Sequence, residues 1–277
     1  MAERLPDGGS CDILSAMNVC RAMNVPPTPE GPPTADHFLA GRLRLRQMAR
    51  GHRAGTDAVL LAAATPPTTR GLVIDAGAAT GIVGLAAARR APAAQIALLE
   101  IDSAACALAR ENIAENDLAA RAAVHEADLL SAASRRAGGL ANESADVVLT
   151  NPPYLTPGRA RVSPDPRRAL AHVSAKGLEP WLRACAALLR PGGLFVMIHR
   201  ADALADCLAS VGARLGALAI LPVCPREGEA ATRILLRGVK GSRAPLSLLP
   251  PLVLHEADGA FTPRAAALHR GEDELPW

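Results

Sequence analysis

The chain has 277 residues, of which 49% are apolar and 21% charged, so it has enough apolar surface to enclose a sizeable core and is not a disordered chain. The formal net charge is only +3, so any nucleic-acid-binding surface must be local, and an aromatic content of 2% excludes a stacking platform of several aromatic rings. The six cysteines form no C-x-x-C pair and no Cys/His ligand spacing, so we expect neither a disulfide framework nor a metal site.

Residues 1–33 are irregular and end in a proline-rich run, and we expect them to form a flexible N-terminal extension. They lack a basic start followed by a continuous apolar region, which is the pattern of a secretory signal. The most apolar window, residues 71–88, contains four glycines and Asp75, which disfavours a membrane-spanning helix. We therefore expect a cytoplasmic protein with no membrane partner and a single folded domain over residues 34–277.

Short strands and helices alternate along this domain. Leu39, Leu43 and Leu45 alternate with arginines in a strand or hairpin segment, and Thr56-Asp57 is expected to cap a helix over residues 58–64. Seven strands are predicted, at residues 72–74, 95–99, 122–125, 146–149, 194–199, 217–223 and 232–239. Three helices are predicted among them, at residues 81–90, 103–116 and 181–190.

This alternation predicts an α/β fold with a doubly wound, mostly parallel sheet and helices on both faces. No segment of helix length separates the last two strands, residues 217–223 and 232–239. We therefore expect these two strands to form a C-terminal antiparallel hairpin.

A glycine-rich loop, Asp75-Ala76-Gly77-Ala78-Ala79-Thr80-Gly81, joins the first predicted strand to a helix. In an open α/β sheet, ligands bind at the carboxyl ends of the strands, where small residues allow close approach and the helix start offers free N–H groups. The spacing differs from the dinucleotide fingerprint G-x-G-x-x-G, and Asp75 would repel a pyrophosphate but suit a cationic ligand. Glu100 ends the second strand, where it can accept hydrogen bonds from ribose hydroxyls. The alternative is that both carboxylates are solvated or capping groups and that the glycines only permit tight packing.

The loop resembles the first motif of class I S-adenosylmethionine-dependent methyltransferases. This resemblance implies S-adenosyl-L-methionine as the cofactor and a Rossmann-like, seven-strand sheet with a reversed last strand. It also implies a set of cofactor-binding residues: Asp75, Ala76, Gly77, Gly81, Glu100 at the ribose, and Asp128 with Leu129 at the adenine. Ala79 departs from the family pattern, which often has a further glycine at that position.

The fourth strand leads into Asn151-Pro152-Pro153-Tyr154. Two successive prolines hold the neighbouring carbonyls rigidly, so a carboxamide oxygen and a carbonyl can together accept both hydrogens of a planar amino group. Tyr154, the only tyrosine of the chain, can lie against the ring that carries the amine. The alternative is a proline-rich strand exit with a surface tyrosine. The tetrapeptide resembles the motif of amino methyltransferases that act on adenine, guanine or glutamine nitrogens, which implies that these four residues are catalytic.

Transfer to nitrogen is favoured on mechanistic grounds. Positioning an amine in line with a sulfonium methyl can contribute about 7–11 kcal/mol, and two hydrogen bonds to the amine about 1–3 kcal/mol each. A strong general base is not required, because the nitrogen can lose its proton after the transfer. Methylation of a ring carbon would use a cysteine nucleophile, and the first cysteine after the motif is Cys185.

Arginine clusters flank both motifs. Five arginines are expected to contact phosphates of an RNA substrate: Arg53, Arg159, Arg161, Arg167 and Arg168. The alternative is a solubilising surface, because 28 of the 30 basic residues are arginine. One aromatic residue at the site is enough to hold a base that is already unpaired.

The segments 41–47 and 51–62 resemble the corresponding part of bacterial tRNA(Val) adenine-N6 methyltransferases. With the motifs above and Pro225-Arg226-Glu227-Gly228, the likeness extends over about residues 34–271. It implies that Gly55, Thr56 and Asp57 lie near the methionine end of the cofactor and that the substrate is RNA, specifically a tRNA adenine. The sequence does not indicate the oligomeric state.

Four other interpretations remain. Release-factor methyltransferases share the Asn-Pro-Pro-Tyr segment, so the acceptor could be a protein glutamine amide, although about 70 N-terminal residues leave little room for their helical docking domain. The exocyclic N2 of guanine in rRNA is another possible acceptor. A short-chain dehydrogenase would need a lysine four residues after its tyrosine, where this chain has Gly158. A protein that only binds the cofactor or RNA is the non-catalytic alternative.

Overall fold

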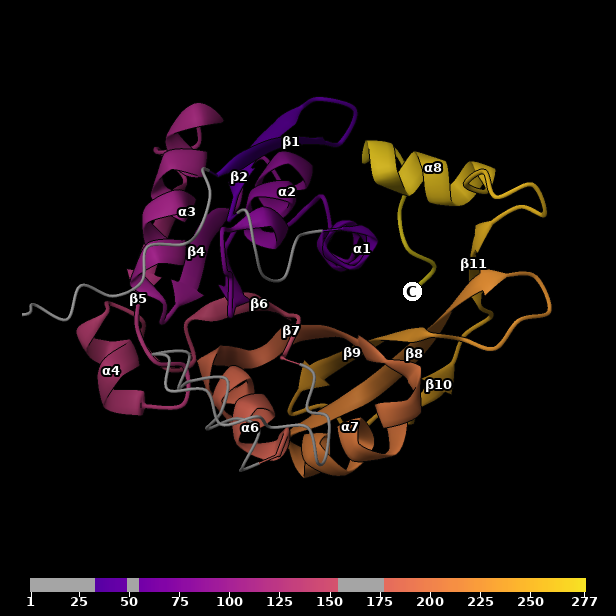
Figure 1. Cartoon of the computed structure of the whole chain (residues 1–277). Helices are drawn as coiled ribbons and strands as arrows, with labels where there is room; N and C mark the ends of the chain where they lie inside the picture. The colour runs from indigo at the N-terminus through magenta and orange to yellow at the C-terminus, as the bar shows by residue number, and fades with distance from the viewer. Residues whose placement is uncertain (1–32, 49–54, 154–176) are drawn as a thin grey trace, which may run out of the picture.

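The computed structural model describes residues 33–48, 55–153 and 177–277 (Figure 1). The seven predicted strands are confirmed, and all of them belong to one sheet. They are β3 (Leu72–Ala76), β4 (Gln95–Glu100), β5 (Ala122–Glu126), β6 (Ala145–Thr150), β7 (Leu189–Arg200), β8 (Leu215–Arg226) and β9 (Arg233–Lys240). Two short strands that were not predicted, β10 (Ser247–Leu248) and β11 (Leu252–His255), pair with β8 and extend the sheet to nine strands.

The strand order is β10-β8-β9-β7-β6-β3-β4-β5. Strands β3 to β7 pair in parallel, whereas β9 is antiparallel to both β7 and β8. The predicted parallel sheet with an antiparallel C-terminal hairpin is therefore confirmed. After β3 the strand order proceeds to β4 and β5 on one side of β3. The next strand, β6, lies on the other side of β3, so the order reverses there. In α/β sheets this switch point is where ligands bind.

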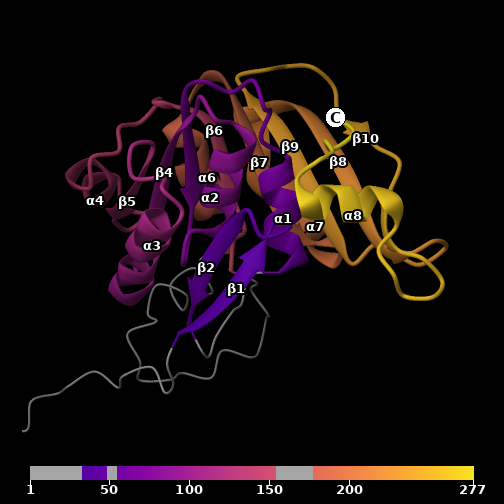
Figure 2. The same ribbon diagram turned by 90° about the horizontal axis from the view of Figure 1, so that it is seen from above.

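Helices cover both faces of the sheet (Figures 1 and 2). One face carries α1 (Thr56–Ala63), α2 (Ile82–Arg90), α3 (Ser103–Glu115) and α8 (Pro263–Arg270), and the other carries α4 (Ala132–Ala137), α6 (Glu179–Leu188) and α7 (Leu204–Val211). Successive residues of β3 divide between the two cores, with Val73 in one and Ile74 in the other. Because the central strands are buried on both sides, they are almost continuously apolar.

The N-terminal hairpin β1 (Thr34–Phe38) and β2 (Leu43–Gln47) lies over α2 and α3 (Figure 2). Two asparagines, Asn112 in α3 and Asn116 at its C-cap, bond to the free edge of β2. The side-chain oxygen of Asn112 accepts from Arg46 N at 2.7 Å, and that of Asn116 from Arg44 N at 2.9 Å. The Asn112 amide also donates to Thr80 O at 2.9 Å. The hairpin is thereby connected to the glycine-rich loop.

The start of α1 differs from the prediction. Its N-cap is Gly55, no side chain caps the helix, and Thr56 is already the first helical residue, so the predicted Thr56-Asp57 cap is wrong. The Asp57 carboxylate instead binds the guanidinium of Arg233 at the start of β9, with Oδ2 and Nε 2.9 Å apart. A charge-assisted bond to a neighbouring strand thus replaces the expected local cap.

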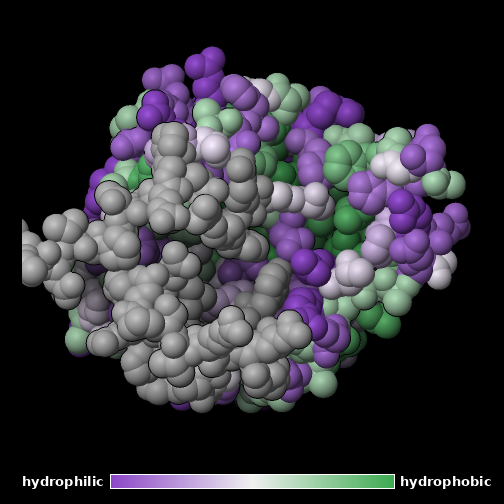
Figure 3. Space-filling view, in the orientation of Figure 1, coloured by the Kyte–Doolittle hydropathy of each residue, from purple (hydrophilic) through white to green (hydrophobic). Residues whose placement is uncertain are grey.

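The surface of the described residues is hydrophilic along most of the rim in Figure 3, and hydrophobic residues show in the recess between α8 and strands β8 and β9. Among the described helices, none is both long and apolar enough to cross a membrane.

Candidate functional site

Two neighbouring parallel strands, β3 and β6, end at the same edge of the sheet. In their register Ala76 is paired with Thr150, the last residue of each strand. The next residue of each chain segment is Gly77 on one side and Asn151 on the other. Gly77 and Asn151, which are 74 residues apart in the sequence, therefore follow neighbouring strand ends.

The glycine-rich loop is fixed by backbone hydrogen bonds to β4. The Gly77 and Ala78 N–H groups both donate to Leu99 O, at 2.9 and 3.0 Å. Gly81 is the N-cap of α2 with φ 92°, a left-handed conformation that favours glycine. Ala79 also has a positive φ of 48°, so a residue with a Cβ occupies a conformation that glycine would adopt more readily. The departure from the family pattern at Ala79 thus falls on a left-handed position.

Asp75 lies below this loop and is almost fully buried, with 2% of its surface exposed. Its Oδ2 accepts a hydrogen bond from Gly84 N of α2 at 2.9 Å. Burial raises the pKa of the Asp75 carboxyl to about 7, the Gly84 hydrogen bond opposes this shift, and the nearby Glu100 adds to it. A buried carboxylate with so few hydrogen bonds is stabilised by a cation, so Asp75 suits a positively charged ligand.

Glu100 joins the loops that follow β3 and β4. Its Oε2 accepts from Ala79 N at 2.8 Å, while Oε1 accepts from Ile101 N and Asp102 N at 2.7 and 2.9 Å. A carboxylate has about four lone-pair sites, so it can still accept a further bond from a hydroxyl. These contacts hold the carboxylate beside the glycine-rich loop.

Asp128 and Leu129 follow β5, the next strand outward. The Asp128 Oδ1 accepts from Leu130 N at 2.8 Å, which orients the carboxylate within its own loop. The Leu129 side chain is buried in the core shared with α6, so only its backbone can contact a ligand at the strand ends. Asp128 is partly exposed.

Asn151 is the first residue after β6 at this edge of the sheet. Its side-chain Oδ1 is buried and has no hydrogen-bond partner among the described residues. A buried acceptor without a donor costs about 1–3 kcal/mol, so such a group is expected to bind a ligand. Pro152, which follows, is buried and cannot donate a hydrogen bond. The carboxamide oxygen is therefore available to an N–H donor from outside the chain.

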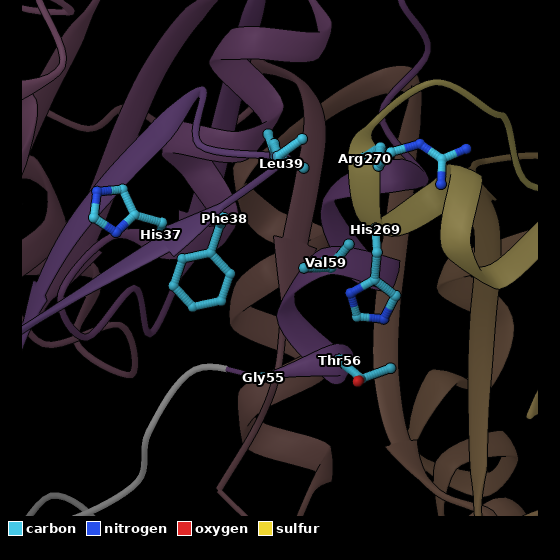
Figure 4. A pocket seen from close by; sticks show the side chains of 9 residues that line it. His37, Phe38, Leu39, Gly55, Thr56, Val59, His269 and Arg270 are labelled. Atoms are coloured by element: carbon cyan, nitrogen blue, oxygen red, sulfur yellow. The ribbon is translucent and has the colours of Figure 1, made fainter. Parts of the chain in front are cut away.

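Gly55, Thr56 and Asp57 lie at the start of α1, which packs against α2 and also contacts β6 and β7. Gly55 and Thr56 line a cavity of about 390 Å³. Its other described walls are formed by His37, Phe38, Leu39, Ala40, Val59, His269 and Arg270. Figure 4 shows the rings of Phe38 and His269 on two sides of this cavity and the Arg270 guanidinium directed away from it. The described lining includes neither the glycine-rich loop nor the Asn151 segment.

The remaining predicted residues, Tyr154 and the five expected RNA-binding arginines 53, 159, 161, 167 and 168, lie outside the described residues. Two arginines of the N-terminal hairpin segment, Arg42 and Arg46, have partners within the protein. Arg46 pairs with Glu115, with Nε and Oε1 2.5 Å apart, and Arg42 donates to the carbonyl of Arg270. These two arginines therefore help to hold the hairpin in place.

Sequence reasoning missed two residues, Thr150 and Trp181. Thr150 is fully buried, and its hydroxyl donates to Ala76 O at 2.8 Å, across the two strand ends. Trp181 of α6 donates from Nε1 to the same hydroxyl oxygen at 2.9 Å. Both were visible in the sequence, one as the residue before the Asn-Pro-Pro motif and one as a rare aromatic, but no spacing rule connects them.

Cys185 lies one turn after Trp181 and is fully buried. Burial raises the pKa of its thiol to about 12, so the nucleophilic thiolate form is absent at neutral pH. The thiols of Cys106 and Cys207 have their pKa values raised to about 11 and about 12, again mainly by burial. None of these three cysteines suits covalent catalysis.

Comparisons with known proteins identify the family of the chain. The family model described as "Methyltransferase small domain" matches residues 53–203. A relative from Aeromonas hydrophila named tRNA1(Val) (adenine(37)-N6)-methyltransferase is 33% identical over 216 residues, which are 76% of this chain and 86% of the relative. A protein of the same name from Porphyromonas gingivalis is 28% identical over 243 residues, 84% of this chain and 93% of the relative.

A solved structure from Agrobacterium tumefaciens, described as a predicted O-methyltransferase, is also similar. It is 34% identical, has a TM-score of 0.67, and the match covers 79% of this chain and 98% of that one.

Proposed function

The chain belongs to the methyltransferase small domain family and is an S-adenosylmethionine-dependent methyltransferase, and from this premise we propose that it methylates the exocyclic N6 of an adenine in tRNA. The observation that carries this proposal is the buried Asn151 Oδ1, which has no hydrogen-bond partner in the part of the chain that the structure describes. Asn151 follows Thr150, which is paired with Ala76 at the end of β3. An acceptor in this place is what an amino group facing the cofactor needs.

The described residues fit the cofactor. Gly77 and Gly81, both at positive φ, shape a narrow loop between β3 and α2, and Asp75 and Glu100 provide carboxylates around it. When bound, S-adenosylmethionine supplies an electrophilic methyl group on a sulfonium. Asp75 favours its positive charge, while Glu100 retains acceptor capacity for the ribose hydroxyls. We assign Asp128 to the adenine end and the start of α1 to the methionine end.

Asn151 and the proline-held carbonyls after it orient the acceptor. Their role is to accept hydrogen bonds from the two N–H groups of a planar amine, so that the nitrogen lone pair faces the methyl donor. Because this arrangement places the reacting atoms in line, it can supply about 7–11 kcal/mol of the catalytic effect. Tyr154 is assigned to the ring face of the substrate base.

The acceptor pair favours nitrogen over the other atoms that methyltransferases use. A hydroxyl group that receives the methyl has one hydrogen to donate and requires a base to remove it. An amino group has two hydrogens to donate and requires no base before the transfer. Ring-carbon methylation through a cysteine is disfavoured, because burial raises the pKa of the Cys185 thiol, the nearest in sequence after the motif, to about 12. The site therefore supports amine methylation.

The choice of tRNA rests on the two relatives named above and on the arginines around the motifs. The test is mass spectrometry of nucleosides from the purified tRNA of a strain that lacks the gene. We expect N6-methyladenosine to disappear from one tRNA position and to return when wild-type protein, but not the Asn151→Ala variant, is supplied. Unchanged tRNA nucleosides in the deletion strain would contradict the proposal.

The high pKa of Asp75 makes cofactor affinity depend on pH. Below about pH 7 the free protein holds Asp75 protonated, because burial raises its pKa to about 7, and a cationic ligand must then displace this proton. We expect the dissociation constant of S-adenosylmethionine to rise as pH falls from 7 to 5.5, by up to about tenfold per unit. Isothermal titration calorimetry with wild-type and Asp75→Asn proteins measures this effect.

The Asp75→Asn variant retains an acceptor for Gly84 N but cannot titrate. It is expected to bind the cofactor more weakly than wild type at pH 7.5 and with little pH dependence in this range. Any titration of the cofactor itself is common to both proteins, so the difference between them isolates Asp75. Parallel pH profiles would remove Asp75 from cofactor binding.

A further inference from the structure

Trp181 connects the cofactor loop with the strand that carries Asn151. Its indole Nε1 donates to Thr150 Oγ1 at 2.9 Å, and its six-membered ring lies against Gly77. The ring is so close that a Cβ placed on Gly77 would be 2.9 Å from one ring carbon and 3.0 Å from another. One side chain of α6 thus contacts both Gly77 in the glycine-rich loop and Thr150 at the end of β6.

The contact continues through the Thr150 hydroxyl. This hydroxyl accepts from Trp181 and donates to Ala76 O at 2.8 Å, so indole, hydroxyl and carbonyl form a chain of hydrogen bonds from α6 across β6 to β3. Thr150 has no exposed surface, so water cannot replace either partner. These hydrogen bonds lie at the ends of β3 and β6, where the glycine-rich loop and the Asn151 segment follow.

We propose that Trp181, acting through Thr150, is a positioning residue for methyl transfer: it fixes the distance between the cofactor loop and the amine-binding segment at Asn151. The inference rests on the proposed function of Asn151 as the amine acceptor. Trp181 itself need not touch the substrate. A displacement of about 1 Å between reacting groups can cost about 100-fold in rate, so a residue that sets their spacing affects kcat more than it affects binding.

The first test uses Trp181→Phe, which removes the indole N–H donor and the outer part of the ring system that lies against Gly77. We expect kcat for tRNA methylation to fall about tenfold while KM for S-adenosylmethionine stays within about twofold. The matched control is Trp277→Phe, since Trp277 is the only other tryptophan and lies against Arg237 on β9. This control should keep the wild-type kcat. A wild-type kcat in Trp181→Phe, or an equal fall in both variants, would overturn the proposal.

Thr150 variants separate positioning from a general loss of stability. Thr150→Ser keeps the hydroxyl and should keep most of the activity, whereas Thr150→Val loses the hydrogen bonds to Trp181 and Ala76 and should lower kcat. Because the two residues share one of these hydrogen bonds, the double variant Trp181→Phe/Thr150→Val should lose less activity than the product of the two single losses predicts. Additive losses, or a serine variant as slow as the valine variant, would contradict the proposed chain.

A fluorescence measurement separates failure of this inference from failure of the proposed function. In the Trp277→Phe protein, Trp181 is the only tryptophan, so its emission reports directly on the cofactor loop. We expect S-adenosylhomocysteine to change this emission. If wild-type protein transfers no methyl group to tRNA, the proposed substrate is wrong, yet an emission change still supports Trp181 beside the cofactor loop. A constant emission on saturation with S-adenosylhomocysteine would overturn the role of Trp181.

Discussion

Replacing Asn151 by alanine is expected to reduce kcat for methyl transfer by about 10³-fold while leaving the dissociation constant of S-adenosylmethionine within about twofold. Within residues 33–48, 55–153 and 177–277 the buried carboxamide oxygen accepts no hydrogen bond, so removing the side chain breaks none of that oxygen's hydrogen bonds in this part of the protein. The amine, in contrast, loses the acceptor that orients its lone pair. Single-turnover kinetics with tRNA and calorimetric titration with the cofactor measure the two effects separately.

Two further variants make this result specific. Asn151→Asp keeps an acceptor oxygen in the same place and should retain more activity than Asn151→Ala. Asn142→Ala, which removes an exposed asparagine whose oxygen accepts from Arg135 at 3.2 Å, should transfer methyl groups at the wild-type rate. Turnover of Asn151→Ala at more than about a tenth of the wild-type rate would exclude Asn151 from the mechanism, whichever substrate is used.

The regular part of the fold was predictable because burial leaves a strong sequence pattern. Strands β3, β4 and β6 are packed between two layers of helices, so they appear as short apolar runs that end at a functional residue. The loop after β3 was predictable from its glycines, because a left-handed turn at Gly77 and Gly81 restricts the residue type. Local constraints of this kind can be identified from a single sequence.

The elements that escaped prediction depend on partners far away in the chain. Helix α4 has only six residues, and β10 has two, so neither shows a period. The start of α1 looked like a side-chain cap, but Asp57 binds Arg233, 176 residues later. The asparagines in α3 and at its C-cap that bond to β2 are ordinary residues until the hairpin lies beside them.

The candidate site divides in the same way. Asp75, Glu100 and Asn151 were found because each follows or ends a strand, and parallel strands bring such residues to one edge. Trp181 was missed because it reaches Gly77 and Thr150 from α6, a helix that the sequence does not connect with either strand end. No sequence pattern connects Trp181 with Gly77 and Thr150.

A single added methyl group on Gly84 is expected to destabilise the domain, although alanine is the better helix former. Alanine in place of glycine inside α2 would by itself gain about 1 kcal/mol. A Cβ at Gly84, however, would be 2.3 Å from Leu98 Cδ2, while one at Gly81 would be 2.7 Å from Leu98 Cδ1. Leu98 is fully buried and held between these two glycines, so neither methyl can move away. The steric cost therefore exceeds the gain in helix propensity.

We expect Gly84→Ala to lower the free energy of unfolding by about 2 kcal/mol, within the range of overpacked cores, in urea titrations with an unchanged m-value. Gly55→Ala is the matched control, because a Cβ there meets no atom within 4 Å, and its effect should stay below about 1 kcal/mol. Shortening Leu98 to valine should relieve the contact, so the Gly84→Ala/Leu98→Val protein should be more stable than the sum of the single losses predicts. Because Gly84 N also donates to Asp75, the Gly84→Ala protein should bind S-adenosylmethionine more weakly as well. A Gly84→Ala protein as stable as wild type would mean that α2 can move away from β4, which a loop fixed by Leu99 and Glu100 does not allow.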